Sequence, residues 1–379
     1  MKRLMLTISA GEWDGINHRP HHFMRRFAVG GWKVLYLEPP ATFIAPFKNR
    51  HFLKRWKNWL LGLRRESQNL YLLAPPPVLP FGNKYRFINK FNQGLIAGTV
   101  KRACRSLGYT GMDVYSFLPW AVDLLPHIKY DRVIYDCVDD HTAFSGFIDA
   151  GMVYQMEREL MGRADVSFAT AKKLYEDRRD WSSNFYIIPN GAEYEHFAAE
   201  GRDIPGDLGE IMHPVAGFVG GISDWVDVSL MAAAARQLPE MTFVLVGPVL
   251  TDVSCLEALD NVRLLGPKPY ANLPAYVRFF DVCLVPFKIN KLTESVNPIK
   301  MFEYLAAGKP VVSTPLPEVL PYQDVVAVAE GEQETVAAIR AALEPEAHSQ
   351  ERVESRRKVA RENSWDARWR KAAELIEKC

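Results

Sequence analysis

The sequence, 379 residues long, lacks the motifs by which several large enzyme classes are recognised. It contains no P-loop, no Gly-x-Ser-x-Gly nucleophile turn and no Gly-x-Gly-x-x-Gly dinucleotide fingerprint. It also has no Asp-x-Asp pair, which could hold a divalent cation against a diphosphate. P-loop NTPases, α/β-hydrolases and dinucleotide-dependent enzymes are therefore disfavoured, and we expect neither a metal ion nor a cofactor.

Cysteine, net charge and long apolar runs are also scarce. The five cysteines are widely spaced and form no Cys-x-x-Cys pair, so we expect neither a disulfide framework nor a zinc site, and a reducing, cytoplasmic compartment fits best. The first apolar run, Leu4–Ala10, is too short for a signal-peptide core, and no later run reaches the length that spans a bilayer. A net charge of +1 argues against a nucleic-acid partner.

Two series of short apolar runs alternate with helical patterns along the chain. Runs that are apolar on both faces are typical of parallel strands covered by helices on both sides, so the alternation predicts a doubly wound α/β protein with two Rossmann-like domains. We expect these domains at residues 1–205 and 206–362, joined within Glu200–Pro214, followed by a helix at 363–379. The expected strands are Leu4–Ser9, Lys33–Leu37, Asp113–Phe117, Arg132–Tyr135, Val166–Thr170, Phe185–Ile188, Val215–Gly220, Thr242–Val246, Val262–Leu265, Val282–Pro286, Pro310–Ser313 and Val325–Val328.

The segment 41–110 has an unusual charge balance. It holds 13 Lys or Arg against one acid, Glu66, interleaved with aromatic and aliphatic residues. An amphipathic helix around Phe47–Arg65 would place its aromatics at the headgroup level of an anionic membrane and its basic side chains toward the phosphates. The alternative is a solvated helix whose aromatics pack on their own domain. We favour the membrane surface as a partner, with peripheral attachment to the inner face of the plasma membrane.

The stretch Thr293–Thr314 is the most informative, since it predicts a loop, a helix opening near Pro298, a glycine stop and a buried strand. A helix N-terminus presents free N–H groups and the positive end of its dipole, and so can hold an anion. Lys300 and Glu303 lie three residues apart on one helix face. There the lysine can meet a phosphate and the carboxylate can accept two ribose hydroxyls; an ordinary exposed lysine and a surface acid are the alternatives.

This stretch resembles the nucleotide-sugar motif of GT-B glycosyltransferases, especially family 4 and its exopolysaccharide and teichuronic-acid relatives. The resemblance continues through Ile188–Ala192 with its Pro-Asn-Gly turn, Asn261–Pro267 and Asn363–Trp365. It implies two Rossmann-like domains facing across a cleft, with a C-terminal helix that crosses back to the first domain. It also implies metal-independent transfer from a nucleotide-diphosphate sugar, most commonly a UDP-sugar.

Carried over residue by residue, the resemblance gives the second domain a donor site, in which Glu303 binds the ribose and Lys300 a phosphate. The family's second glutamate falls on Ser295, with Glu294 one position away, and this leaves the contact with the donor hexose open. The glycine loop lacks the arginine and lysine of many relatives, so that neutralisation of the diphosphate falls to Lys300, helix ends, or another lysine such as 268 or 291. The expected donor-binding residues are Gly220, Gly221, Gly266, Lys268, Asn297, Pro298, Ile299, Lys300 and Glu303.

The first domain carries the expected catalytic and acceptor residues. Three carboxylates and a histidine follow a buried strand at Asp136–His141, at the end where α/β sheets place ligands. Relatives carry a His-Asp or Ser-Asp pair whose acid corresponds to Asp139, which either takes a proton from the acceptor or caps a helix. In the loop Gly11–His22, Arg19 could hold an anionic acceptor group. The expected residues are Asp139, Asp140 and His141 for catalysis, and Asp14, Arg19, His21 and His22 for the acceptor.

The sequence thus predicts a glycosyltransferase that acts on a lipid-linked or polysaccharide acceptor in cell-envelope or exopolysaccharide biosynthesis. A UDP-sugar 2-epimerase-like enzyme and a non-catalytic nucleotide-sugar-binding or scaffold protein are the alternatives. The donor sugar, the linkage and the choice between retention and inversion stay open.

Overall fold

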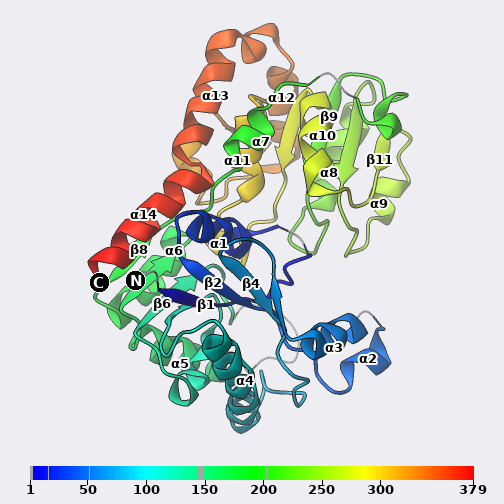
Figure 1. The fold of residues 1–379 in the computed structure, drawn as a ribbon. Coiled ribbons are helices and arrows are strands. Elements are labelled where there is room, and N and C mark those ends of the chain that lie inside the picture. The colour runs from blue at the N-terminus through cyan, green and yellow to red at the C-terminus, as the bar shows by residue number, and fades with distance from the viewer. Residues whose placement is uncertain (1–2, 16, 51, 143–148, 202–203) are drawn as a thin grey trace. The chain divides into compact units, whose positions relative to one another are not determined.

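The computed structural model describes residues 3–15, 17–50, 52–142, 149–201 and 204–379. The chain divides into two compact units, one of Met1–Ile188 with Trp369–Cys379 and one of Pro189–Arg368. Each is a largely parallel sheet covered by helices (Figure 1), which confirms the α/β prediction. The division falls before the expected junction, because α7 (Tyr194–Ala198) packs against α10 (Leu273–Phe279) and α11 (Ile299–Ala306) of the second unit.

The first unit contains, in its described part, a sheet of eight strands in the order β3-β4-β2-β1-β5-β6-β7-β8. All pair in parallel except β3 with β4. The six strands expected here are present, whereas β3 and β4 were missed: they are short, and β3 carries two arginines in three residues. The elements are β1 Leu4–Ile8, α1 Arg19–Val29, β2 Lys33–Leu37, α2 Ala45–Lys48, α3 Phe52–Leu61, β3 Leu63–Arg65, β4 Leu70–Leu73, α4 Arg86–Ser106, β5 Asp113–Ser116, β6 Arg132–Cys137, α5 Ala150–Met161, β7 Val166–Ala169, α6 Lys172–Arg178 and β8 Phe185–Ile187.

The second unit contains, within the residues that the structure describes, a parallel sheet of six strands in the order β11-β10-β9-β12-β13-β14. All six were expected. Its core is built from strands that are buried along nearly their whole length, such as β9 and β12. The remaining elements are β9 Val215–Val219, α8 Val228–Gln237, β10 Thr242–Val246, α9 Ser254–Glu257, β11 Val262–Leu264, β12 Val282–Val285, β13 Val311–Ser313, β14 Ala327–Val328, α12 Gly331–Ala342 and α13 Gln350–Glu362.

The C-terminal residues complete the first unit. α14 (Trp365–Lys378) ends there, and the Trp369 ring lies edge-on to Phe27, with ring centroids 6.0 Å apart. Gly30 makes this contact possible, because a Cβ at that position would lie 2.7 Å from the indole.

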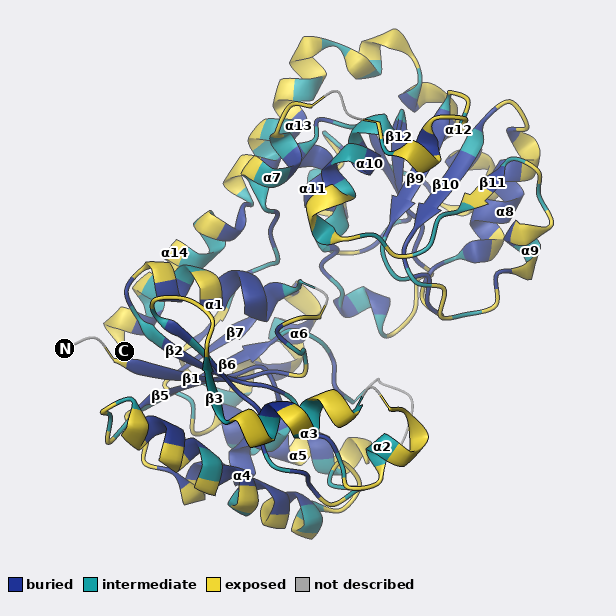
Figure 2. Cartoon of the chain, turned by 45° about the vertical axis from the view of Figure 1, so that its right-hand side comes forward, coloured by how far each residue is buried: buried dark blue, intermediate teal, exposed yellow. Residues whose placement is uncertain are grey.

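The basic and aromatic segment does not form the single helix that we expected around Phe47–Arg65. It forms α2, α3 and β3, and His51 lies outside the described residues. Figure 2 shows that much of α2 and α3 is exposed, although Trp56 is half-buried and lies edge-on to Phe43 at 6.3 Å. No helix in the described ranges combines the length and the apolar character needed to cross a membrane.

Candidate functional site

Glu303 occupies the buried face of α11 and is 8% exposed. Because burial disfavours the ionised carboxylate, it raises the pKa of Glu303 from 4.5 to about 7. The charge of Lys300 and the hydroxyl of Tyr270 oppose this rise, while Glu193 adds to it. The free protein therefore holds a carboxylate that changes charge near neutral pH.

Lys300, one turn earlier, is held against two aromatic rings. Its Nζ lies 4.7 Å from the centroid of Phe287 and 5.4 Å from that of Phe218, and burial lowers its pKa from 10.5 to about 8. The Lys300 side chain fits here because residue 220 is a glycine. The φ of Gly220 is +148°, and a Cβ there would lie 2.9 Å from Cε of Lys300. A bound anion would stabilise the ammonium in place of the water that burial removes.

Three glycines stand just beyond the carboxyl ends of the neighbouring strands β9, β10 and β11. They are Gly220, Gly247 and Gly266, with φ of +148°, +153° and +66°. The backbone after β9 contacts the backbone after β10: Gly220 N donates to Val246 O at 2.8 Å, and a Cβ at Gly247 would overlap the Gly220 carbonyl. These three glycines, here called the glycine edge, leave the carboxyl end of the sheet without side chains, so that a ligand can approach the backbone there. Sequence reasoning missed Gly247, although a glycine directly after a buried strand was a usable signal.

Asn297 connects the start of α11 to the Pro-Asn-Gly turn. Its side chain accepts from Asn190 N at 3.1 Å and donates to Glu318 at 3.0 Å, while its carbonyl accepts from Asn190 Nδ2 at 2.9 Å. Asn297 is 3% exposed, Pro298 caps the helix and Ile299 begins it. The geometry gives Asn297 a positioning role, and the donor contacts of these three residues stay predictions.

Lys268 and the loop before α11 have partners of their own. Lys268 Nζ lies 2.7 Å from Asp207, which also accepts from Tyr276 at 2.8 Å. Lys291 is exposed. Ser295, in place of the family's second glutamate, is 4% exposed, and Glu294 is half-buried. Gly221, beside Gly220, is half-buried. The cluster closest to a donor site is therefore Lys300, Glu303 and the glycine edge.

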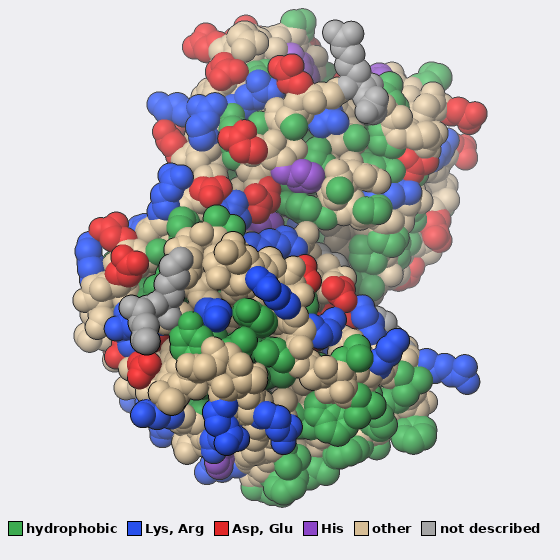
Figure 3. Space-filling view, in the orientation of Figure 1, with side chains coloured by type: hydrophobic (Ala, Val, Ile, Leu, Met, Phe, Trp, Pro, Cys, Tyr) green, Lys and Arg blue, Asp and Glu red, His purple; other side chains and the backbone are tan. Residues whose placement is uncertain are grey.

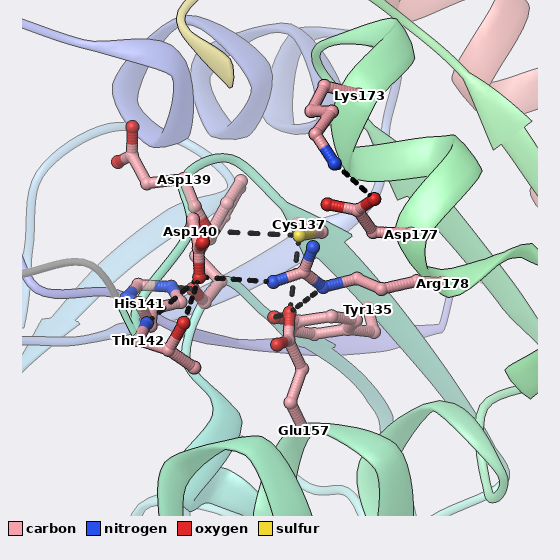
Figure 4. Close-up of polar contacts among 11 residues, drawn as sticks. Tyr135, Cys137, Asp139, Asp140, His141, Thr142, Glu157, Lys173, Asp177 and Arg178 are labelled. Carbon is pink, nitrogen blue, oxygen red and sulfur yellow. Dashed lines mark hydrogen bonds and ion pairs between the residues drawn. The ribbon is translucent and has the colours of Figure 1, made fainter. Parts of the chain in front are cut away.

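In the first unit, Asp139 follows β6 in a loop held by a buried network. Burial raises its pKa, Asp140 adds to the rise, and His141 and His18 oppose it. Figure 4 shows the Asp139 carboxylate pointing away from the guanidinium of Arg178. Asp139 is thus half-buried, and the charges of two histidines favour its ionised form.

Asp140 and His141 instead shape the loop. Asp140 accepts from Thr142 N at 3.0 Å and lies 3.4 Å from Arg178, which pairs with Glu157 at 2.9 Å. His141 is 7% exposed, and its Nε2 lies 3.2 Å from Phe117 O. Asp140 and His141 therefore have structural contacts, and the catalytic roles of all three residues stay predictions.

Arg19 is paired with a buried carboxylate, whereas we expected it to be available to an anionic acceptor group. It is 2% exposed, and its Nε donates to Asp136 Oδ2 at 2.9 Å. Tyr115 donates to the same oxygen at 2.8 Å. The ion pair joins α1 to β6 and leaves no exposed surface to support the predicted contact with an acceptor anion.

The two histidines of the loop are also buried. His21 is fully buried, and burial together with the nearby His18 lowers its pKa to about 3. His22 is 1% exposed, whereas Asp14 is exposed and lies 3.0 Å from Lys54. Both histidines therefore pack at the start of α1, and Asp14 is the predicted acceptor residue that solvent reaches.

Sequence reasoning missed His18. It is half-buried, it caps α1 through its backbone N–H donating to His21 Nδ1 at 3.4 Å, and its side chain affects the pKa of Asp139. A Cβ at Gly11 would overlap the His18 ring, so the imidazole can occupy this position only because residue 11 is a glycine. Only the fold shows this, because Gly11 and His18 look unrelated in the sequence.

Comparison with known proteins finds related sequences. The model of the family "Glycosyl transferases group 1" matches residues 213–344. The chain is 32% identical over 266 residues to a Bacillus subtilis (strain 168) protein assigned as the teichuronic acid biosynthesis glycosyltransferase TuaH, and this match covers 64% of the chain and 66% of TuaH, just under two thirds of its length. Over residues 213–344 the chain is thus similar to the group 1 glycosyltransferases.

Solved structures establish the fold of the chain as GT-B. Sucrose-phosphate synthase of Thermosynechococcus elongatus superposes with a TM-score of 0.74 at 15% identity, over 100% of this chain and 99% of that one. HepE of Anabaena, solved in complex with UDP-glucose, superposes with a TM-score of 0.71 at 14% identity over the whole of both chains. At such identities the likeness concerns the fold alone. The family match spans Gly220, Lys300 and Glu303, while Asp139 lies outside it.

Proposed function

We propose that this protein is a glycosyltransferase, which moves a sugar from a UDP-sugar to a lipid-linked or polysaccharide acceptor at a membrane surface. The observation that carries the proposal is the pair Lys300 and Glu303 on one face of α11, beside the side-chain-free edge at Gly220. Burying a carboxylate and partly burying an ammonium costs free energy, and perturbed groups of this kind are typical of ligand sites. A nucleoside diphosphate offers hydroxyls to the first and phosphate charge to the second.

The choice of uridine and of an envelope polysaccharide is supported by the relatives. HepE, which shares the fold, is described with UDP-glucose, and TuaH is named for teichuronic acid biosynthesis. Asp139, which follows β6 and whose pKa is raised by burial, is the group that we propose to act on the acceptor hydroxyl.

The membrane role rests on the apolar surface of α2 and α3. Figure 3 shows hydrophobic side chains gathered on this face, with basic side chains beside them. Phe47 is 89% exposed and Leu60 is 76% exposed, values that are unfavourable in water unless another surface covers them. Lys and Arg side chains complement anionic headgroups. The exposed basic residues here are Lys48, Arg50, Lys54 and Lys57.

The test is a thermal-shift screen of UDP-, GDP-, ADP- and dTDP-sugars on the wild type and on Glu303→Ala. A ligand at 100 times its Kd stabilises by about 2.7 kcal/mol. We expect a UDP-sugar to raise the Tm of the wild type and not that of the variant. Glu257→Gln, at an exposed position on α9, is the control. An equal shift in Glu303→Ala would remove Glu303 from the site.

One observation favours a second candidate, a nucleotide-sugar-binding protein without transferase activity. Ser295 stands where the family has its second glutamate, and it is nearly fully buried. Radiolabel transfer from the UDP-sugar to membrane lipids separates the two: transfer supports the enzyme, and binding without transfer to lipid or water supports the binding protein. Sugar turnover without any acceptor would instead support the epimerase-like alternative.

A further inference from the structure

A groove of about 520 Å³ opens in the first unit between the α2–α3 segment and the N-terminal half of α4. Its volume lies in the range of about 300–1,000 Å³ that is usual for small-molecule sites. The side chains that define it are mostly apolar: Ile44, Phe52, Val78, Leu79, Ile96 and Trp120. None of the residues assigned above to donor binding or catalysis lines it.

The amides at the floor of the groove bind groups of the protein itself. Asn89 Nδ2 donates to Asp123 at 2.8 Å and to Trp120 O at 3.2 Å. Asn92 accepts from Leu79 N and donates to Leu79 O, both at 2.9 Å. These bonds hold the wall in place and direct the amides away from a ligand, so that the groove suits a hydrocarbon better than a sugar.

The outer rim of the groove is an exposed apolar surface. Phe81 is 48% exposed and has a φ of +66°, which a bulky residue adopts only at a cost in strain. On α4, Phe87, Phe91 and Leu95 are 73%, 56% and 40% exposed, but they lie on the helix face opposite the residues that line the groove. The groove is also lined by Ile44, Lys48 and Phe52 of the α2–α3 segment, so it opens beside the face that we propose lies against the membrane.

One lining residue of the groove, Trp120, contacts the loop of Asp139. The Trp120 ring, which lines the groove, lies edge-on to the His141 ring at 5.7 Å between centroids. His141 and His18 both act on the pKa of Asp139. A chain that enters from the rim would thus bring its polar end toward the proposed acceptor site.

We propose that this groove binds the hydrocarbon chain of the lipid-linked acceptor and so aligns the acceptor's head with Asp139. The proposal rests on the function proposed above and adds to it a binding site for the lipid part of the acceptor. The apolar lining, the walls that the α2–α3 segment supplies, and the contact of Trp120 with His141 together favour a single-chain lipid anchored in the bilayer.

The first experiment measures binding of octyl, decyl and dodecyl phosphate to the full chain by calorimetry, below their micelle concentrations. Each added methylene contributes about a fourfold gain in affinity, since its burial is worth about 0.8 kcal/mol. We expect Ala45→Trp, which fills the groove, to lower the affinity for dodecyl phosphate more than tenfold, and Ala258→Trp, at an exposed position of the second unit, to leave it unchanged. Affinity independent of chain length, or equal in the two variants, would overturn the proposal.

The second experiment locates the chain and keeps the answer clear if Ala45→Trp fails to fold. Dodecyl phosphate with a terminal diazirine is irradiated with the wild type, and the labelled peptides are identified by mass spectrometry. Labels in residues 78–96 support the groove. Labels confined to the surface of α2 and α3, or an equal pattern with a diazirine phosphatidylglycerol, show general membrane contact and refute it.

The two proposals can fail separately. If a UDP-sugar shifts the wild type and transfer occurs at a rate that does not depend on acceptor chain length, the groove proposal is wrong and the proposed function stands. If dodecyl phosphate binds in the groove but no nucleotide sugar binds, the proposed function is wrong while the lipid site stands.

Discussion

The replacement Glu303→Gln tests the donor site most sharply, because the variant keeps the shape of the side chain and removes its charge. In the free protein burial raises the pKa of Glu303 to about 7 and lowers that of Lys300 to about 8. If the ligand requires ionised Glu303 and charged Lys300, its affinity is greatest between these two values. One pH unit below 7, about one tenth of Glu303 is ionised. We therefore expect the affinity at pH 6 to be about tenfold lower than that of the fully ionised form.

The same substitution has an expected effect on stability, with the opposite sign. The folded state binds the Glu303 proton more tightly than the unfolded chain, so the wild type loses stability as pH rises from 4.5 to about 7. The rise in pKa corresponds to about 3 kcal/mol. We therefore expect Glu303→Gln to be more stable than the wild type by ~1–3 kcal/mol at pH 8 and no more stable at pH 4.5.

The assay is calorimetric titration with UDP-glucose between pH 6 and 9, combined with urea unfolding at the same pH values. UDP-glucose is preferred to UDP because a terminal phosphate titrates near pH ~6 and would add its own pH dependence. The variant should bind ~10–100-fold more weakly at pH 7.5, since a hydrogen bond to a charged group contributes about 1.5–3 kcal/mol, and it should show no loss of affinity from pH 7 to 6. A wild-type affinity that is flat over this interval would refute the reasoning.

Further predictions concern the glycine edge, the buried ion pair and the exposed apolar face. Gly220→Ala should lower UDP-glucose affinity in calorimetry and destabilise by about 1–3 kcal/mol in urea, because its φ disfavours a side chain and Lys300 occupies the space; unchanged binding would contradict this. Arg19→Met should cost about 3–5 kcal/mol in urea unfolding at pH 7, since it leaves a buried Asp136 without its cation, and a loss below 1 kcal/mol would contradict the structural role. Phe47→Ser should reduce co-sedimentation with phosphatidylglycerol vesicles about tenfold or more, because burial of such a side chain contributes about 1.5–3 kcal/mol; Leu320→Ser, exposed in the second unit, is the control, and an equal loss there would contradict a localised membrane face.

The strands of both units could be predicted because parallel strands buried on both faces leave continuous apolar runs. Lys33–Leu37 and Thr242–Val246 have the expected bounds. The signal fails at β3, a short and partly exposed edge strand, and at its neighbour β4, whose buried run is only four residues long. It also fails in Phe47–Arg65, since the basic and aromatic pattern does not reveal where a helix ends and an edge strand begins.

The sequence by itself determined the alternation of strands and helices, the motif that places Lys300 and Glu303 on one turn of a helix, and the charge of the 41–110 segment. These depend on spacing along the chain, which backbone periodicity converts directly into a shared face. The tertiary structure alone decided which charged groups are buried. Arg19 meets Asp136 across 117 positions of sequence, and Gly220 leaves the space through which Lys300 passes. No local pattern records such pairings, because the burial that fixes a side chain's charge, partner and accessibility comes from chain segments that only folding brings together.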